Sequence, residues 1–388
     1  MANLIGARIE RKEDKKFLTG KGKYTADINL PKQTYAYFVR SPHARAKITK
    51  VDHSKAMKAP GVIDVFTGDC VAKDKIGGLI CGWKIVSQDG KDMKCPPHPV
   101  LAKDSVNFVG DHVAVVVAET LEQAKNAAEL VNVSYKIQKA VIKTEEATSF
   151  ENIHEGIDNN LSFDFLLGDK GKTDEAFSKA DKIVKLDIVN NRLIPNAMEP
   201  RAAIGDYNAS SDELTLYTAS QNPHLDRLIM SAFNAVHPEH KFRIVAPDVG
   251  GGFGSKINVY AEDVVVAYAS KKIGRPVKWV AERSESFMSD NHGRDHVTHA
   301  ELAVSNDGKM IGIKVDTIAN LGAYSLVLAA VTPTYLYAPL LLGIYDIPTA
   351  CCTVKGVYTN TAPTDAYRGA GRPEATYVIE RIVTEAAK

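Results

Sequence analysis

The segment AYRGAGRPE, Ala366–Glu374, places two arginines, a glutamate and several small residues close together near the end of the sequence. A loop of this composition lets backbone N–H and guanidinium donors approach an anionic or oxo-bearing ligand closely. Two earlier segments have a related character: SQNPH, Ser220–His224, and VGGGFGSK, Val249–Lys256. Together, the three segments indicate a binding site for a large organic cofactor.

The glycine run VGGGFGSK lies between a predicted strand and a predicted helix. Successive glycine N–H groups can form an anion-binding nest, and the start of the following helix adds a positive dipole end. A Walker A loop or a dinucleotide fingerprint requires a different glycine spacing from the one that ends in Gly254, Ser255 and Lys256. The alternative is a tight, flexible connection, but four glycines in five positions exceed what an ordinary turn uses.

Three further segments each allow a functional and a structural interpretation. In SQNPH, the Gln221 amide could donate to an oxo group, whereas Asn222 could instead be a helix N-cap. In MEPR, we predict a surface ion pair between Glu199 and Arg201, worth about 0–1 kcal/mol. HGRDH, residues 292–296, contains metal-ligand residue types but no complete ligand set, which disfavours a metal site.

Composition narrows the class of protein. The 388 residues suffice for two or three domains, and 45% hydrophobic with 24% charged residues is an ordinary composition for a globular protein. The net charge of +1 gives no strong electrostatic attraction to nucleic acid or to a membrane surface. The uncharged stretch 317–345 is long enough to span a bilayer, but its prolines and polar residues favour a buried, bent path. Five cysteines without CxxC spacing predict reduced thiols, and the charged N-terminus favours a cytoplasmic protein.

Hydrophobic patterns predict an α/β (α+β) fold with two domains, residues 1–140 and 141–388, separated by a polar, irregular stretch. Thr120 and Gln123 predict a capping box at the start of a helix. The helices are expected at residues 121–131, 173–180 and 258–274, the last ending at Gly274. Strands are expected at residues 35–41, 62–68, 112–119, 131–137, 182–189, 213–220, 241–247 and 276–282.

The motifs, in their order along the chain, resemble one family. GKGKYTADINLP, FVRSPHARAKI and APGVIDVFTG resemble an N-terminal α/β hammerhead domain. MEPRAAIGDY, SQNPH, GGGFGSK and AYRGAGRPE resemble the first part of a molybdopterin-binding domain. The chain is therefore similar to the molybdopterin-binding large subunit of molybdenum hydroxylases, which comprise xanthine dehydrogenase, aldehyde oxidoreductase and aerobic carbon monoxide dehydrogenase.

The resemblance implies a molybdenum–molybdopterin cofactor, with the metal held through the pterin rather than by side chains, and the pterin can carry a cytosine dinucleotide. It implies that Gln221 lies beside the oxo ligand and that Arg368 faces the substrate, both as catalytic residues. The residues expected to contact the cofactor are Gln221, Gly251, Gly252, Phe253, Gly254, Arg368 and Gly369. Electrons from a small-molecule substrate would pass to a [2Fe-2S] small subunit and an FAD-binding medium subunit.

Three positions depart from particular members of the family. Gly369 replaces the copper-bearing cysteine of carbon monoxide dehydrogenases, Ile257 replaces the acidic residue of purine hydroxylases, and Ala370 replaces their aromatic residue. An apolar side chain cannot hydrogen-bond a purine. We therefore expect an aldehyde substrate. The alternatives are a protein grouped with the carbon monoxide dehydrogenases but without their cysteine, and a non-catalytic scaffold.

Large subunits of the family are longer than this chain, and the part without a counterpart here carries the catalytic glutamate. We expect this part to come from a C-terminal half of the large subunit or from a second polypeptide. A general base must lie within hydrogen-bond reach of the proton that it takes, so this chain alone is expected to be incomplete as a catalyst.

Overall fold

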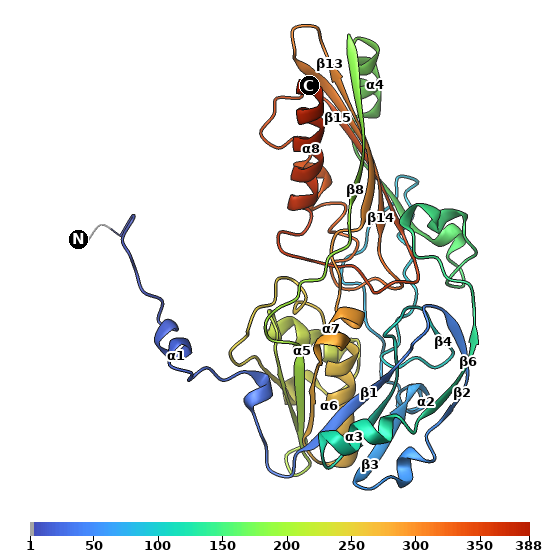
Figure 1. Ribbon diagram of the computed structural model, residues 1–388, viewed down its shortest axis with the longest axis vertical. Coiled ribbons are helices and arrows are strands. Elements are labelled where there is room, and N and C mark those ends of the chain that lie inside the picture. Colours follow the sequence, from blue (N-terminus) through green and yellow to red (C-terminus); the bar gives the residue numbers. More distant parts are fainter. Residues whose placement is uncertain (1–3) are drawn as a thin grey trace.

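The computed structural model describes residues 4–388 and has an α+β architecture with three sheets, as predicted. The view in Figure 1 shows an elongated molecule, with one sheet and the helix α8 at the end that holds the C-terminus and a second group of sheets and helices at the other end. The N-terminal residues, with the short helix α1 (Asp14–Leu18), extend away from this body.

The largest sheet has seven strands and combines residues from both predicted domains. Its order is β11 (Phe242–Val245), β10 (Glu213–Thr218), β9 (Ala202–Asn208), β12 (Val277–Val280), β1 (Thr34–Arg40), β5 (His112–Ala118) and β3 (Val62–Thr67). Strands from the two predicted domains meet where β1 pairs in parallel with β12, with Thr34 opposite Val277. The predicted boundary near residue 140 thus follows three strands that belong to a sheet completed by later residues.

The second sheet has five strands and lies at the C-terminal end of the molecule. Its order is β7 (Leu161–Gly168), β15 (Ala350–Val357), β14 (Met310–Asn320), β13 (His296–Val304) and β8 (Lys182–Asn190). The final helix, α8 (Arg372–Ala387), packs on β13 and β8 (Figure 1). Buried apolar residues of α8, such as Val378 and Ile382, share one core with the inner face of this sheet.

The remaining elements complete the body. A three-stranded sheet has the order β4 (Ser105–Val106), β2 (Ala46–Asp52) and β6 (Asn132–Ile137). The other α-helices are α2 (Gly68–Lys73), α3 (Leu121–Ala128), α4 (Lys170–Ser178), α5 (Pro223–Ala232), α6 (Ala261–Ile273) and α7 (Arg283–Ser289). Short 3₁₀ helices span Thr25–Asp27, Ala56–Lys58, Thr144–Ser149, Asp158–Asn160, Glu239–Lys241 and Ala338–Leu340.

Two predicted helix ends are confirmed by their capping contacts. Thr120 Oγ1 accepts the N–H of Gln123 at 3.2 Å, and the Gln123 side chain accepts the N–H of Thr120 at 3.1 Å, which completes the capping box of α3. Gly274 ends α6 in the left-handed region with φ +67°. Because α6 is buried and packs on β9, β10 and β12, its start is fixed relative to the seven-stranded sheet.

The uncharged stretch 317–345 follows a bent path, as predicted. It completes β14, then turns repeatedly and includes the 3₁₀ helix Ala338–Leu340. Within residues 4–388, no helix has both the length and the apolar character needed to cross a membrane.

Candidate functional site

The three segments singled out in the sequence meet at one place, where strands of the seven-stranded sheet and α8 end or begin. The Gly254 N–H donates to Gln221 Oε1 at 2.9 Å, and the Gln221 N–H donates to Lys256 O at 2.8 Å. The Arg368 N–H donates to Phe253 O at 2.8 Å. The glycine loop 249–256 is therefore bonded on one side to the SQNPH segment and on the other side to the AYRG segment.

Glycine permits the close approach at two of these contacts. A Cβ on Gly252 would lie 2.3 Å from Gln221 Oε1, and a Cβ on Gly254 would lie 2.2 Å from Ala366 O. Gly254 also has φ +106°, a conformation that L-residues rarely adopt. Phe253 has φ +54° and a side chain that is 43% exposed. The run of glycines thus allows the two neighbouring segments to approach the loop closely, and it turns the Phe253 ring outward.

The SQNPH segment holds Gln221 between β10 and α5. Asn222 occupies the N-cap position of α5, as the alternative interpretation predicted, but its side chain makes no capping hydrogen bond. Ser220 Oγ instead accepts the Asn222 N–H at 3.0 Å and donates to the buried Asp226 carboxylate. The main chain on either side of Gln221 is therefore fixed.

Gln221, Phe253, Arg368 and Gly369 are all exposed, and the first three present different chemistry. The Gln221 Oε1 atom is held by Gly254, which leaves its Nε2 amide group as a hydrogen-bond donor. The Arg368 guanidinium lies 5.9 Å from the centre of the Phe253 ring, within cation–π range. An amide donor, an aromatic ring and a permanent positive charge suit a ligand that carries both oxo groups and a flat ring system, as molybdopterin does.

The prediction of a surface ion pair between Glu199 and Arg201 is wrong. Glu199 Oε2 accepts the Gly250 N–H at 2.7 Å and Lys256 Nζ at 2.8 Å, and the same Nζ donates to Glu199 O at 2.9 Å. Burial lowers the pKa of Lys256, and Glu199 counteracts this shift. Glu199 thus binds both ends of the glycine loop rather than Arg201.

Arg201 belongs to a buried charge cluster beneath the site. Its guanidinium contacts Glu262 in bidentate geometry at 2.9 and 3.0 Å and Asp290 at 2.6 Å, and only 5% of the residue is exposed. It also stacks 3.6 Å from the centre of the Tyr260 ring. Burial alone would raise the pKa of Glu262, but the charge of Arg201 holds it well below its usual range. The cluster ties the start of α6 to the segment that precedes HGRDH.

Arg294 of HGRDH holds the AYRG segment, a role that the sequence analysis did not predict. Its Nη1 donates to Tyr367 O at 2.9 Å and to Glu374 Oε1 at 2.8 Å, and its Nη2 donates to Arg368 O at 2.9 Å. A Cβ on Gly293 would lie 2.4 Å from Tyr367 Cβ. The signal available in the sequence was the glutamate of AYRGAGRPE, which needs a cationic partner when it is buried.

The metal interpretation of HGRDH finds no support in the described part of the chain, where no group of three or more His, Cys, Asp and Glu residues could hold a metal ion. Burial lowers the pKa of His292 to about 4 and also lowers that of His296. His292 contacts Arg192, whereas the His296 ring packs against Tyr337. The two histidine side chains therefore have different neighbours.

The positions that depart from family members lie at or near this face. Gly369 has φ +93°, and a Cβ there would lie 2.7 Å from Pro373 Cγ, so a cysteine would be strained in this loop. Ile257 is half-buried and follows the glycine loop directly. Cys351 and Cys352 are both buried on β15 and are free thiols, as predicted. Neither is part of the AYRG segment.

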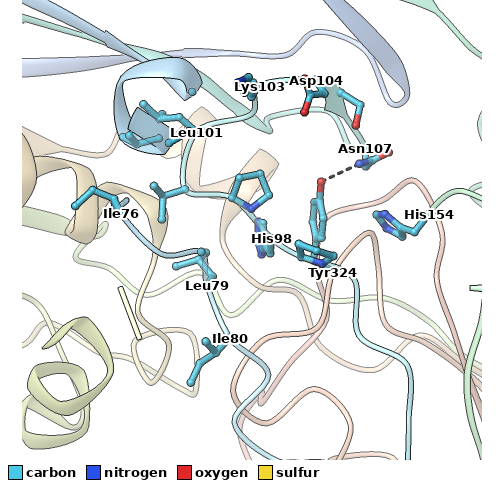
Figure 2. A pocket seen from close by; sticks show the side chains of 18 of the residues that line it. Ile76, Leu79, Ile80, His98, Leu101, Lys103, Asp104, Asn107, His154 and Tyr324 are labelled. Atoms are coloured by element: carbon cyan, nitrogen blue, oxygen red, sulfur yellow. Dashed lines mark hydrogen bonds between the residues drawn. The ribbon is translucent and has the colours of Figure 1, made fainter. Parts of the chain in front are cut away.

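A separate cavity of ≈ 930 Å³ lies away from these loops (Figure 2). The His98 ring stacks on Tyr324 at 4.0 Å between ring centres, and Asn107 Nδ2 donates to Tyr324 Oη at 2.8 Å. Burial lowers the pKa of His98 to about 3, so the ring is neutral at pH 7. None of the predicted site residues lines this cavity.

Two family models match the chain. The model for the molybdopterin cofactor-binding domain matches residues 153–388, and the model for the aldehyde oxidase and xanthine dehydrogenase a/b hammerhead domain matches residues 19–139. The predicted domain boundary at residue 140 stays a prediction, because the seven-stranded sheet spans it.

Three known proteins are similar over nearly the whole chain. The carbon monoxide dehydrogenase large chain of Hydrogenophaga pseudoflava is 35% identical, over 96% of this chain and 47% of that protein. The nicotinate dehydrogenase large molybdopterin subunit of Eubacterium barkeri is 30% identical, over 95% of this chain and 82% of that protein. The structure of quinoline 2-oxidoreductase from Pseudomonas putida 86 has a TM-score of 0.92 and 30% identity, over 98% of this chain and 48% of that one.

The chain thus spans about half the length of the first and third of these proteins and most of the length of the second. Its matched domains, its fold and its ordered motifs agree with one another. The chain belongs to the family of molybdopterin-binding large subunits that includes those of xanthine dehydrogenase, aldehyde oxidoreductase and carbon monoxide dehydrogenase.

Proposed function

We propose that this chain forms one side of a molybdenum–molybdopterin site in a hydroxylating oxidoreductase that acts on an aldehyde. The observation that carries the proposal is the meeting of Gln221, the glycine loop and Arg368 on one exposed face. These residues lie on three separate segments, and buried contacts from Glu199 and Arg294 hold two of the segments in place. Such support of a ligand-facing group by buried partners is what a preorganised site requires.

The overall reaction converts an aldehyde and water into a carboxylic acid, two protons and two electrons. The bound cofactor supplies the redox chemistry. With the cofactor bound, Gln221 Nε2 would donate a hydrogen bond toward an oxo group, because Gln221 Oε1 is held by the Gly254 N–H, and N–H groups of the glycine loop would be further donors. Arg368 places a positive charge where a carbonyl oxygen gains negative charge, which is the arrangement that lowers the energy of such a transition state.

The aldehyde assignment is supported by side chains that are absent from the face. Gly369 offers no thiol for copper, and its left-handed backbone disfavours any side chain. Ile257 and Ala370 offer neither a carboxylate to hydrogen-bond a purine nor an aromatic ring to stack on one.

A second candidate substrate is a nitrogen-containing aromatic ring. Two of the similar proteins carry nicotinate and quinoline in their names. A ring carbon beside nitrogen is electron-poor, like an aldehyde carbon, and the Phe253 ring could stack on a flat substrate. Competition between a benzaldehyde and a quinoline for the same oxidised enzyme would separate the two classes.

We propose that the rest of the site, including the general base, comes from further residues of the large subunit or from a second polypeptide. The two alternatives match two lengths among the similar proteins, because this chain covers 82% of the nicotinate dehydrogenase subunit and 47% of the carbon monoxide dehydrogenase large chain. A [2Fe-2S] small subunit and an FAD-binding medium subunit are the proposed electron acceptors, a cytosine dinucleotide is the proposed pterin extension, and the cytoplasm is the proposed location.

Coexpression of the chain with the remaining large-subunit residues and both electron-transfer subunits tests the proposal. Aldehydes, carbon monoxide, purines and quinolines would each be added to the oxidised complex, and the bleaching of the flavin and iron–sulfur absorbance would be followed. Reduction by aldehydes is expected. Reduction by carbon monoxide at a matching rate would refute the role assigned to Gly369, and reduction by none of the four classes would favour a non-catalytic scaffold.

A further inference from the structure

Cys81 and Cys95 face one another across an irregular hairpin. The hairpin runs from Leu79 to His98, whose side chains are labelled in Figure 2, and it is antiparallel at both ends. The Leu79 N–H donates to His98 O at 2.8 Å, and near the tip the Met93 N–H donates to Ile85 O at 2.8 Å. This pairing places Cys81 and Cys95 on adjacent stretches of backbone, one or two positions out of direct register.

The two thiols are close enough to influence each other's ionisation. The Cys81 thiol donates to Trp83 O at 3.4 Å. Cys95 is exposed and Cys81 is half-buried, so a small reagent can reach Cys95 first. Neither cysteine belongs to the predicted cofactor-binding face.

Polar and charged groups surround the Cys95 sulfur. The hydrogen bond from Cys81 is the main cause that lowers the pKa of Cys95 to about 7, and Tyr358, Lys84 and Ser325 lower it further. The hydrogen bond to Cys95 and burial raise the pKa of Cys81. A pair in which one thiol ionises near neutral pH and the other stays protonated is suited to a nucleophilic and a resolving role.

We propose that Cys81 and Cys95 form a redox-active dithiol, which a small disulfide such as oxidised glutathione converts into a reversible intramolecular disulfide. The Cys95 thiolate attacks one glutathione sulfur, the S–S bond breaks, and one glutathione leaves with a proton. Cys81 then loses its proton and attacks the Cys95 sulfur, which releases the second glutathione. Two protein thiols are oxidised and one glutathione disulfide is reduced to two thiols, so atoms and electrons balance.

The other three cysteines provide internal controls. Cys351 and Cys352 are buried on β15, and burial raises the pKa of both thiols. Cys70 lies on α2, where its sulfur is 3.6 Å from Thr67 Oγ1. Oxidation by a mild disulfide is therefore expected to select the Cys81–Cys95 pair.

The test uses the reduced 388-residue chain. It is incubated with mixtures of reduced and oxidised glutathione at pH 7.5, quenched with acid, alkylated and digested, and the peptides are identified by mass spectrometry. A linked Cys81–Cys95 peptide that dithiothreitol removes is expected. Cys81→Ala should convert Cys95 into a glutathione adduct, whereas Cys70→Ala should leave the disulfide unchanged. A native chain in which Cys95 stays reduced, stays glutathionylated or pairs with Cys70 would overturn the proposal.

A second measurement follows the reactivity of Cys95 in the native chain and in one variant. The rate of Cys95 labelling by iodoacetamide in the native chain should reach half its maximum near pH 7, and a free cysteine has its midpoint at about 8.5. In Cys81→Ala, labelling at pH 7 should slow severalfold. A native midpoint at or above that of a free cysteine would remove the nucleophilic role of Cys95. Circular dichroism of each variant separates an effect on the thiols from misfolding.

Discussion

At the scale of single residues, the site depends on buried side chains that hold exposed ones, and Arg294 is the clearest case. It joins the carbonyl groups of Tyr367 and Arg368 to the buried Glu374 carboxylate. Arg294→Ala leaves Glu374 charged and unpaired, so we expect a loss of about 3–5 kcal/mol in the free energy of unfolding. Urea unfolding measures this loss. The exposed Arg381→Ala serves as the control, and an equal effect of both variants would contradict the clamp.

The glycine loop gives a second prediction at this scale. Gly254→Ala combines a positive φ with a Cβ that would lie 2.2 Å from Ala366 O, and we expect it to destabilise the chain by roughly 3 kcal/mol or more. Gly274→Ala also has a positive φ, but nothing lies within 4 Å of the added carbon. It should cost only about 1 kcal/mol. Thermal unfolding of the two variants side by side would show whether close approach or backbone strain governs the loop.

Asp111 gives a pH-dependent prediction. Burial raises its pKa to about 7, although its carboxylate accepts the N–H groups of Asn107 and His112. Because the folded state then binds a proton more tightly than the unfolded state, stability falls as the pH rises from about 4 to about 7. Asp111→Asn should flatten this part of the profile by roughly 1–3 kcal/mol between pH 4 and pH 7. Parallel profiles for the native and variant chains would refute the assignment, and the exposed Asp69→Asn is the control.

At the scale of elements, sequence patterns predicted those parts whose determinants are local. The prediction placed the ends of β1, β3, β5 and α6 to within a few residues. Their apolar runs, and helix caps such as Thr120 of α3 and Gly274 of α6, depend only on residues close together in the sequence. The helix α4 begins three residues before the predicted start because the Asp169 side chain caps it by accepting the Lys172 N–H at 2.9 Å.

Contacts between distant segments could not be predicted in this way. The strand β14 was not predicted. Only its end, residues 317–320, belongs to the uncharged stretch, and its earlier part carries Lys314 and Asp316. The partners of Glu199 and Arg201 were predicted wrongly because the true partners, Lys256 and Glu262, lie more than fifty residues along the chain. A shared site of the three segments was expected from their residue types, and the particular roles of Gln221 and Arg368 were expected from the family resemblance.

At the scale of the whole molecule, the seven-stranded sheet makes the two predicted domains interdependent. Residues 34–118 supply β1, β3 and β5, and β1 pairs with β12. We therefore expect one cooperative unfolding transition for the chain, seen equally by the fluorescence of the buried Trp279 and by circular dichroism. Residues 141–388 expressed alone should aggregate, because β12 would become an open sheet edge. Two resolved transitions, or a soluble and folded 141–388 fragment, would contradict a shared sheet.

The cofactor-binding face is tested most directly by the molybdenum content of the purified complex, measured by mass spectrometry of the metal and compared with large-subunit concentration. The native chain, coexpressed with its proposed partners, should carry stoichiometric molybdenum. Gly252→Val should lose it while α6 stays folded, because the added side chain would displace Gln221. A native complex that assembles and unfolds cooperatively but never acquires molybdenum would contradict the account.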